Sequence, residues 1–244
     1  MKGISEKQFR NLCRTGAISA ILVLAGILAD IFIGSATGGD ISSLPQTAVG
    51  RFEQFRISPF MGLYGLDLLN VINQIILIPA IFTLFIIHIN LNKSGALLAF
   101  TVFLTGTILF IAGNTSLVMY DLSNKYFAAT NETQRLLIAA AGEAMLAKGA
   151  HGGTGVFFGF FLPNLGTLLM SVVMLKGMVF SRIISWTGIA GNLLMLAYIV
   201  AVTFFDSAGT MAMMLAMPGG ILIIVWTILY TKRLFKLKLK DIHQ

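Results

Sequence analysis

The segment Gly62–Asn90 is long and apolar enough to cross a lipid bilayer, yet it carries several polar side chains. Asp67, Asn70 and Gln74 are spaced i, i+3 and i+7, which places them on one face of an α-helix. Because lipid offers no hydrogen bonds, this stripe must face protein or water. It marks a polar region around which a helical membrane protein would fold.

The composition is also typical of a membrane protein. Hydrophobic residues make up 57% of the 244-residue chain and charged residues only 11%, whereas soluble domains carry about 25% charged residues. Apolar runs of spanning length use up most of the chain, so we expect a single domain without a separate soluble part.

The apolar runs predict an all-α integral membrane protein with six transmembrane helices. The expected spans cover residues 16–34, 62–90, 96–120, 153–175, 183–205 and 211–230. Residues 134–150 are helical in propensity but too polar to span, and Asn131 is a plausible N-cap for them. We expect this segment to be an amphipathic helix on the outer interface. Phe52, Phe55 and Phe60, which precede the second span, are expected to rest on the same interface.

An even number of spans places both termini on one side of the membrane. Most of the 17 Lys and Arg residues fall on that side, including Lys93, Lys176 and the basic tail from Lys232 onward. The positive-inside rule therefore predicts a multi-pass protein of the cell membrane with both termini in the cytoplasm. Orientation accounts for the net charge of +7, so we expect membrane lipids, and not nucleic acid, as partners. The oligomeric state does not follow from the sequence.

Four passages are similar to a known group of proteins. They are GAISAILVLAGILADIF, GLDLLNVINQ, the polar stretch GNTSLVMYDLSNKYFAATNETQRLLIAAAGEAMLA, and GGTGVFFGFFLPNLGTLLMSVVMLKGMVFSRIISWTGIAGNLL. Together they resemble uncharacterised bacterial and archaeal multi-span membrane proteins, close to domain of unknown function 4386. The resemblance implies a compact helical membrane fold. It implies no activity and offers no catalytic residues.

Several polar residues are expected at one depth near the outer ends of the helices. The candidate ligand-binding residues are Asp30, Asp67, Asn70, Asn114, Glu143, His151 and Asp206. Acidic residues within a membrane are functional hypotheses by default, and these residues would line an outward-facing polar cavity. We further expect the 134–150 segment to be a lid, with Glu143 or His151 turned toward Asp67 or Asp30. In the alternative interpretation, the acids are solvated near the interface and the Asn residues hold helices together.

The sequence does not offer the residues that haem binding, zinc hydrolysis or a Schiff base would require. His88 and His151 lie a membrane thickness of about 30 Å apart and cannot ligate one haem, and a single outer histidine is too few for a zinc hydrolase. No predicted span contains a lysine for a Schiff base. We therefore predict no catalytic residues, metal or cofactor.

The favoured function is binding or carriage of a small or amphiphilic ligand through the outer cavity. The alternative is a structural or accessory membrane subunit without a ligand. A third possibility, an enzyme at the outer interface, would need a nucleophile or metal that the sequence does not reveal.

Overall fold

The computed structural model describes residues 5–36, 44–205 and 209–242. Every regular element in these ranges is helical, and six segments are long and apolar enough to cross a membrane, as the sequence predicted. They are α1 (Glu6–Ala36), α4 (Leu68–His88), α5 (Lys93–Gly113) continued by α6 (Ser116–Ala128), the short turn η2 (Thr154–Val156) with α8 (Phe157–Gly177), α9 (Arg182–Phe204) and α10 (Gly209–Lys236).

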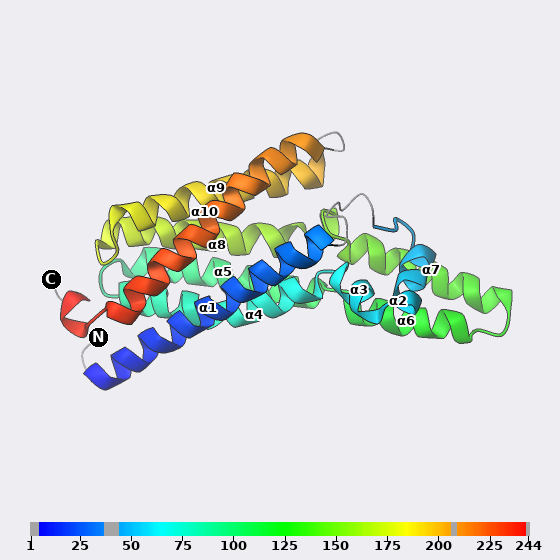
Figure 1. Ribbon diagram of the computed structural model, residues 1–244, viewed down its shortest axis with the longest axis horizontal. Coiled ribbons are helices and arrows are strands. Elements are labelled where there is room, and N and C mark those ends of the chain that lie inside the picture. The colour runs from blue at the N-terminus through cyan, green and yellow to red at the C-terminus, as the bar shows by residue number, and fades with distance from the viewer. Residues whose placement is uncertain (1–4, 37–43, 206–208, 243–244) are drawn as a thin grey trace.

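The long helices form a bundle elongated along one axis (Figure 1). Helix α1 packs on α4 and α10, α5 packs on α8, and α9 packs on both α8 and α10. The first and last described residues lie at the same end of the bundle (Figure 1), where the short turn η3 (Leu239–Ile242) follows α10. We call this the terminal end, and the opposite end the distal end.

A group of shorter helices extends from the distal end. It comprises α2 (Ala48–Ile57), α3 (Pro59–Tyr64), α6 and α7 (Glu132–Gly149), with α6 and α7 forming a helical hairpin. We call this group the distal extension. The hairpin runs outward along the axis of the bundle (Figure 1), whereas an interfacial helix would lie across that axis. The expected helix over residues 134–150, with Asn131 as its N-cap, is confirmed, and as α7 it belongs to a projecting hairpin.

The distal extension has a hydrophobic core of its own. Phe52 and Phe55 of α2 are buried, at 0% and 2% exposure, against Met119 of α6 and Leu146 of α7. The expectation that these two rings rest on the membrane interface was wrong, because burying them against the hairpin removes them from both water and lipid. Phe60 is 58% exposed.

The expected span 96–120 differs from the observed helices. Helix α5 ends at Gly113 and α6 begins at Ser116, because Asn114 adopts an extended backbone conformation. The side-chain oxygen of Asn114 accepts a hydrogen bond of 3.1 Å from the Ser116 backbone N–H. At 1.5 Å per residue, the region Lys93–Ala128 is about 54 Å long, which exceeds the hydrocarbon core of about 30 Å. Only part of it can cross the bilayer.

The expected span 62–90 also starts differently. Its first residues belong to α3, the chain turns at Gly65–Asp67, and α4 begins at Leu68. Asp67 has a left-handed backbone conformation with φ of 63°, which Asp and Asn tolerate better than most residues. Asp67 therefore precedes the helix on which the sequence placed it.

The remaining spans are close to their predicted bounds, and α1 and α10 are longer than predicted. The expected ranges 16–34, 153–175, 183–205 and 211–230 correspond to α1, η2 with α8, α9 and α10. Helices α1 and α10 continue through the basic residues at the terminal end, since Lys and Arg are good helix formers.

Glycines allow two helices to approach closely: a Cβ on Gly166 of α8 would lie 2.5 Å from the backbone nitrogen of Phe103 on α5.

Candidate functional site

A cavity of about 320 Å³ lies inside the bundle, between α1, α4, α5, α8, α9 and α10. It extends from the distal end to about the middle of the helices. Its apolar lining includes Val23, Ile27, Leu77, Phe103, Phe110 and Ile199. Its polar lining includes Asn70, Asn73, Gln74, Asn164, Thr167 and Asn192. The cavity thus offers a largely apolar wall interrupted by amide and hydroxyl groups.

Some of the polar lining holds helices together. The Thr167 hydroxyl on α8 donates a hydrogen bond of 2.5 Å to the side-chain oxygen of Asn192 on α9. The Asn192 amide donates in turn to the carbonyl of Gly188 at 2.7 Å, and the Asn164 amide donates to the carbonyl of Phe160. These groups have partners within the protein, so they are not free to bind a ligand without losing an existing hydrogen bond.

Two polar atoms at the cavity are different. The Oε1 atom of Gln74 on α4 and the Nε1 atom of Trp226 on α10 are buried and have no hydrogen-bond partner in the described part of the chain. Both side chains line the cavity. The first atom is an acceptor and the second is a donor. Because most buried polar groups in proteins are hydrogen-bonded, these two atoms are exceptions, and both belong to side chains that line the cavity.

The distal end of the cavity carries an ion pair. Nδ1 of His151 lies 2.9 Å and 3.0 Å from the two carboxylate oxygens of Asp67, and the Asn70 amide donates to the same carboxylate at 2.9 Å. Asp67 is only 7% exposed. Because an ionised carboxylate can only accept, the His151 Nδ1 atom carries a proton. The expectation that Asp67 avoids lipid and pairs with a polar group is confirmed, but that group was expected on another helix, and His151 lies in the loop after α7.

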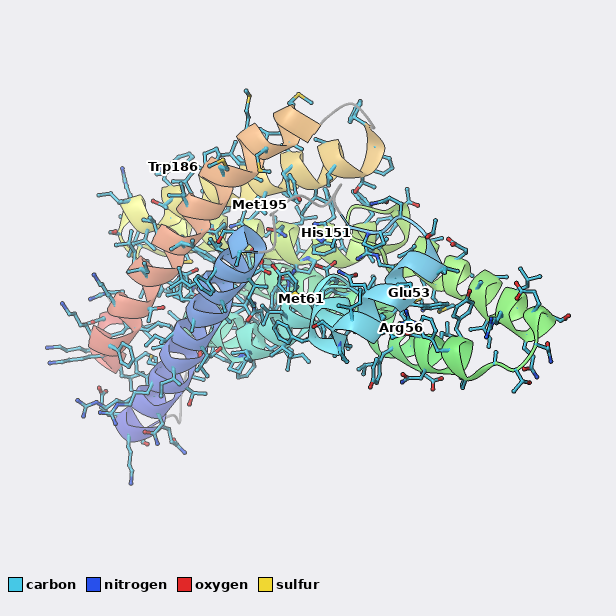
Figure 2. All side chains as sticks on the ribbon, turned by 45° about the vertical axis from the view of Figure 1, so that its right-hand side comes forward. Glu53, Arg56, Met61, His151, Trp186 and Met195 are labelled. Carbon is cyan, nitrogen blue, oxygen red and sulfur yellow. The ribbon has the colours of Figure 1, made fainter. Side chains whose placement is uncertain are left out.

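The other ring nitrogen of His151 faces a tyrosine. Nε2 lies 3.4 Å from the hydroxyl of Tyr198 on α9, and both residues line the cavity. The His151 ring also meets the ring of Phe160 on α8 nearly edge-on, with 5.0 Å between the centroids. Figure 2 shows His151 where the bundle meets the distal extension. Its side chain is 21% exposed, so it is held by protein on most sides.

Opposing effects set the pKa of His151. Burial alone would lower this pKa, but the charge of Asp67, its hydrogen bond and the charge of Asp30 together raise it above the ordinary value. Burial and the charges of Asp30 and Asp67 also raise the pKa of Tyr64 to about 12. The carboxylates at the distal end of the cavity therefore favour the protonated form of His151.

A buried arginine lies near this pair. Arg51 of α2 is 4% exposed, and its Nη1 atom donates to the carbonyl of Gly65 at 3.3 Å. Burial lowers the pKa of Arg51, while the charge of Asp67 acts in the opposite direction. The charge of Asp67 thus interacts with cations from two parts of the chain.

The structure brings together four of the seven candidate residues. Asp67 pairs with His151 and Asn70, and Asp30 lines the same cavity from α1. The Tyr64 hydroxyl donates to the backbone carbonyl of Asp30 at 3.0 Å, which anchors α1 beside the pair.

The other candidates lie elsewhere. Asn114 does not line the cavity: its amide donates to the carbonyl of Leu66 at 2.7 Å. Glu143 accepts a hydrogen bond from the Ala48 backbone N–H at 2.7 Å and caps α2. Asp206 falls outside the described residues. The expectation that Glu143 or His151 turns toward Asp67 or Asp30 is met by His151, whereas Glu143 turns to α2.

The lid expectation for residues 134–150 also needs correction. Helix α7 contributes none of the residues that line the cavity; it packs on α6 and α2 instead. The loop after α7 supplies His151, followed by Gly152 in a left-handed conformation with φ of 77°. The contact with the cavity thus comes from the loop and not from the helix.

Sequence reasoning did not identify Tyr198 or Trp226. Each is an amphipathic aromatic residue within an apolar run, and such residues commonly sit at membrane interfaces or in packed cores. No local pattern distinguishes a cavity position from these. Among the described residues, no group of three or more His, Cys, Asp or Glu side chains is placed to hold a metal ion.

The six spans, the internal cavity and the distal extension define a multi-span helical membrane protein. The family described as Domain of unknown function (DUF4386) matches residues 15–229, and the chain belongs to this family. No curated protein and no solved structure matches the chain significantly.

Proposed function

We propose that this protein binds, and carries, a small amphiphilic molecule in its internal cavity. The observation that carries the proposal is the cavity itself, whose lining side chains include two with a buried polar atom that has no partner among the described residues, Gln74 (Oε1) and Trp226 (Nε1). A buried polar group without a partner costs about 1–3 kcal/mol. If these side chains turn toward the cavity, a ligand hydroxyl would pair with both atoms, whereas a ligand carbonyl, which only accepts, would pair with Nε1 of Trp226 alone.

The remainder of the cavity favours a hydrocarbon body. Its volume of about 320 Å³ falls at the lower end of the range of roughly 300–1,000 Å³ common for small-molecule sites. Apolar side chains make up much of the wall, and the polar groups deep in the cavity are amides and hydroxyls. This lining suits an uncharged head group on an apolar chain or ring, such as a membrane-dissolved alcohol or ketone.

The orientation follows from the basic residues. Lys93, Lys176, Arg182 and the tail from Lys232 onward lie at helix ends that meet at the terminal end. The positive-inside rule places this end in the cytoplasm. In this orientation the distal extension projects outward, and the His151–Asp67 pair faces the outer side of the membrane.

A second candidate function is that of an accessory subunit without a ligand. The bond between Thr167 and Asn192 favours it, since it shows that polar residues in these spans serve helix packing. On that account the cavity would be an internal packing defect. The two candidates differ in whether a molecule copurifies with the protein.

The test is untargeted lipid and metabolite analysis of purified protein. We expect a compound enriched with the wild type and depleted in the double variant Gln74→Leu, Trp226→Phe. The matched control is Trp186→Phe, because Trp186 is 57% exposed and does not line the cavity. Identical extracts from all three proteins would contradict ligand binding and favour the accessory function.

A further inference from the structure

We propose that the Tyr198 hydroxyl reverses the polarity of its hydrogen bond when His151 takes up a proton, so that the protein binds carbonyl-bearing amphiphiles with uptake of one proton. The inference rests on the proposed function and names the ligand class and the residue that couples it to protons. It is carried by the arrangement of Asp67, His151 and Tyr198, which come from three separate parts of the chain.

The first step is the tautomer of His151. Both carboxylate oxygens of Asp67 lie within 3.0 Å of Nδ1, so Nδ1 keeps its proton in either charge state. The neutral ring then has a bare Nε2 atom, which can only accept. Protonation takes place at Nε2 alone, at the atom that faces Tyr198.

The second step is the response of Tyr198. With neutral His151, the Tyr198 hydroxyl donates to Nε2, and the phenolic oxygen offers only lone pairs to the cavity. When Nε2 gains a proton from water, it donates to the phenolic oxygen, and the hydroxyl hydrogen must turn away from the ring. The separation of 3.4 Å is long for the neutral bond and would shorten in the charge-assisted one. One proton is taken up, and no covalent bond other than the new N–H changes.

The third step is the environment of His151. Asp67 faces it from the turn before α4, Asp30 acts on it from α1, and Tyr198 from α9, while α8 contributes the uncharged ring of Phe160. The charge of Asp67 also acts on Arg51 of α2. Two carboxylates thus favour the protonated ring, and burial opposes it.

The consequence for ligands is chemical selectivity. A carbonyl oxygen only accepts, so it gains a donor at Tyr198 only when His151 is protonated. An alcohol both donates and accepts, so it can bind Tyr198 in either state. Affinity for a ketone should therefore fall as pH rises through the pKa of His151, and affinity for the matched alcohol should change little.

The experiment uses Trp226 as its reporter. The chain has two tryptophans, so Trp186→Phe leaves a single one in the cavity wall. The change in its fluorescence intensity and emission maximum is measured with a medium-chain methyl ketone and the secondary alcohol of the same carbon skeleton, at about pH 5.5 and about pH 8.5, on either side of the ordinary histidine pKa of roughly 6.5. We expect the ketone to bind about five- to tenfold more tightly at the lower pH, as one hydrogen bond would provide, and the alcohol to change less than about twofold.

Variants in the same background separate the steps. Tyr198→Phe should still bind the ketone but lose the pH dependence, and His151→Gln should also be independent of pH. Tyr64→Phe is the matched control, because the Tyr64 hydroxyl binds the Asp30 carbonyl at the same end of the bundle but does not line the cavity; it should keep the dependence. The inference would be overturned if ketone binding by Tyr198→Phe kept its full pH dependence, or if ketone and alcohol binding responded equally to pH. Either result would leave the proposed function standing. Absence of any change in intensity or emission maximum with either probe at both pH values would reject both the inference and the proposed function.

Discussion

Glu143 of α7 accepts a hydrogen bond of 2.7 Å from the backbone N–H of Ala48, the first residue of α2. The first N–H groups of a helix have no partner within the helix, and its N-terminus carries partial positive charge. A carboxylate from a distant segment therefore completes α2 and ties it to the hairpin. This contact helps to hold α2 and α7 together within the distal extension.

Glu143→Ala should destabilise the distal extension. Loss of a capping interaction costs about 0.5–2 kcal/mol, and here it also removes a link between α2 and α7. We expect a lower thermal unfolding temperature in detergent and faster proteolysis within residues 116–149. Glu143→Gln keeps an acceptor oxygen and should lose less than the alanine variant. Equal stability of Glu143→Ala and wild type would show that the contact does not hold the extension.

Gly26→Ala should disturb the packing of α1 on α4. A Cβ at this position would overlap the side-chain oxygen of Asn73, which is itself buried. Overpacking of this kind costs about 1–3 kcal/mol. The matched control is Gly220→Ala in α10, where a Cβ would meet nothing within 4 Å; it should be neutral or stabilising by up to about 1 kcal/mol. Thermal unfolding of both variants measures the difference, and equal destabilisation would argue against a specific contact at Gly26.

The stability conferred by His151 should depend on pH. Asp67 and Asp30 outweigh burial and raise the pKa of His151 in the folded protein. A raised folded pKa means that the contribution is fully present below the unfolded value of about 6.5 and is lost as pH rises through the folded value. The stability difference between wild type and His151→Gln should therefore be larger at about pH 5.5 than at about pH 8.5. Asp67→Asn should remove most of this dependence, and a difference that grew with pH would contradict the sign.

Accessibility in intact cells tests the orientation. Cys13 is the single cysteine of the chain and is 2% exposed, so Cys13→Ser provides a background without thiols. Lys125 in the hairpin and Lys232 near the terminal end are both exposed. An impermeant maleimide should label Lys125→Cys before lysis and Lys232→Cys only after it. The reverse pattern would invert the proposed topology.

The fold was largely predictable because the bilayer constrains it strongly. Runs of spanning length, few charges and the family-like passages led to six membrane helices, and the helices and the family match confirm both. The helix ends were less predictable. The breaks at Asp67 and Asn114 lie inside apolar context, and they depend on contacts with His151 and Leu66 that are distant in sequence.

The candidate site was predictable only in part. That Asp67 must avoid lipid follows from hydrogen-bond chemistry alone, and the structure agrees. The sequence did not reveal which residue pairs with Asp67. Glu143 and His151 were equivalent candidates on the same segment, and the hairpin geometry sends the first to α2 and the second to Asp67.

The sequence by itself determined that the chain is a multi-span helical membrane protein with polar groups that need partners, because water and lipid sort residues by composition and period. Only the tertiary structure decided which partners those groups have. Pairing is a matter of distances of about 3 Å between atoms of different helices, and such distances depend on how the helices cross and where they break. For the same reason, the unpaired atoms of Gln74 and Trp226 and the position of Tyr198 beside His151 emerged only in three dimensions.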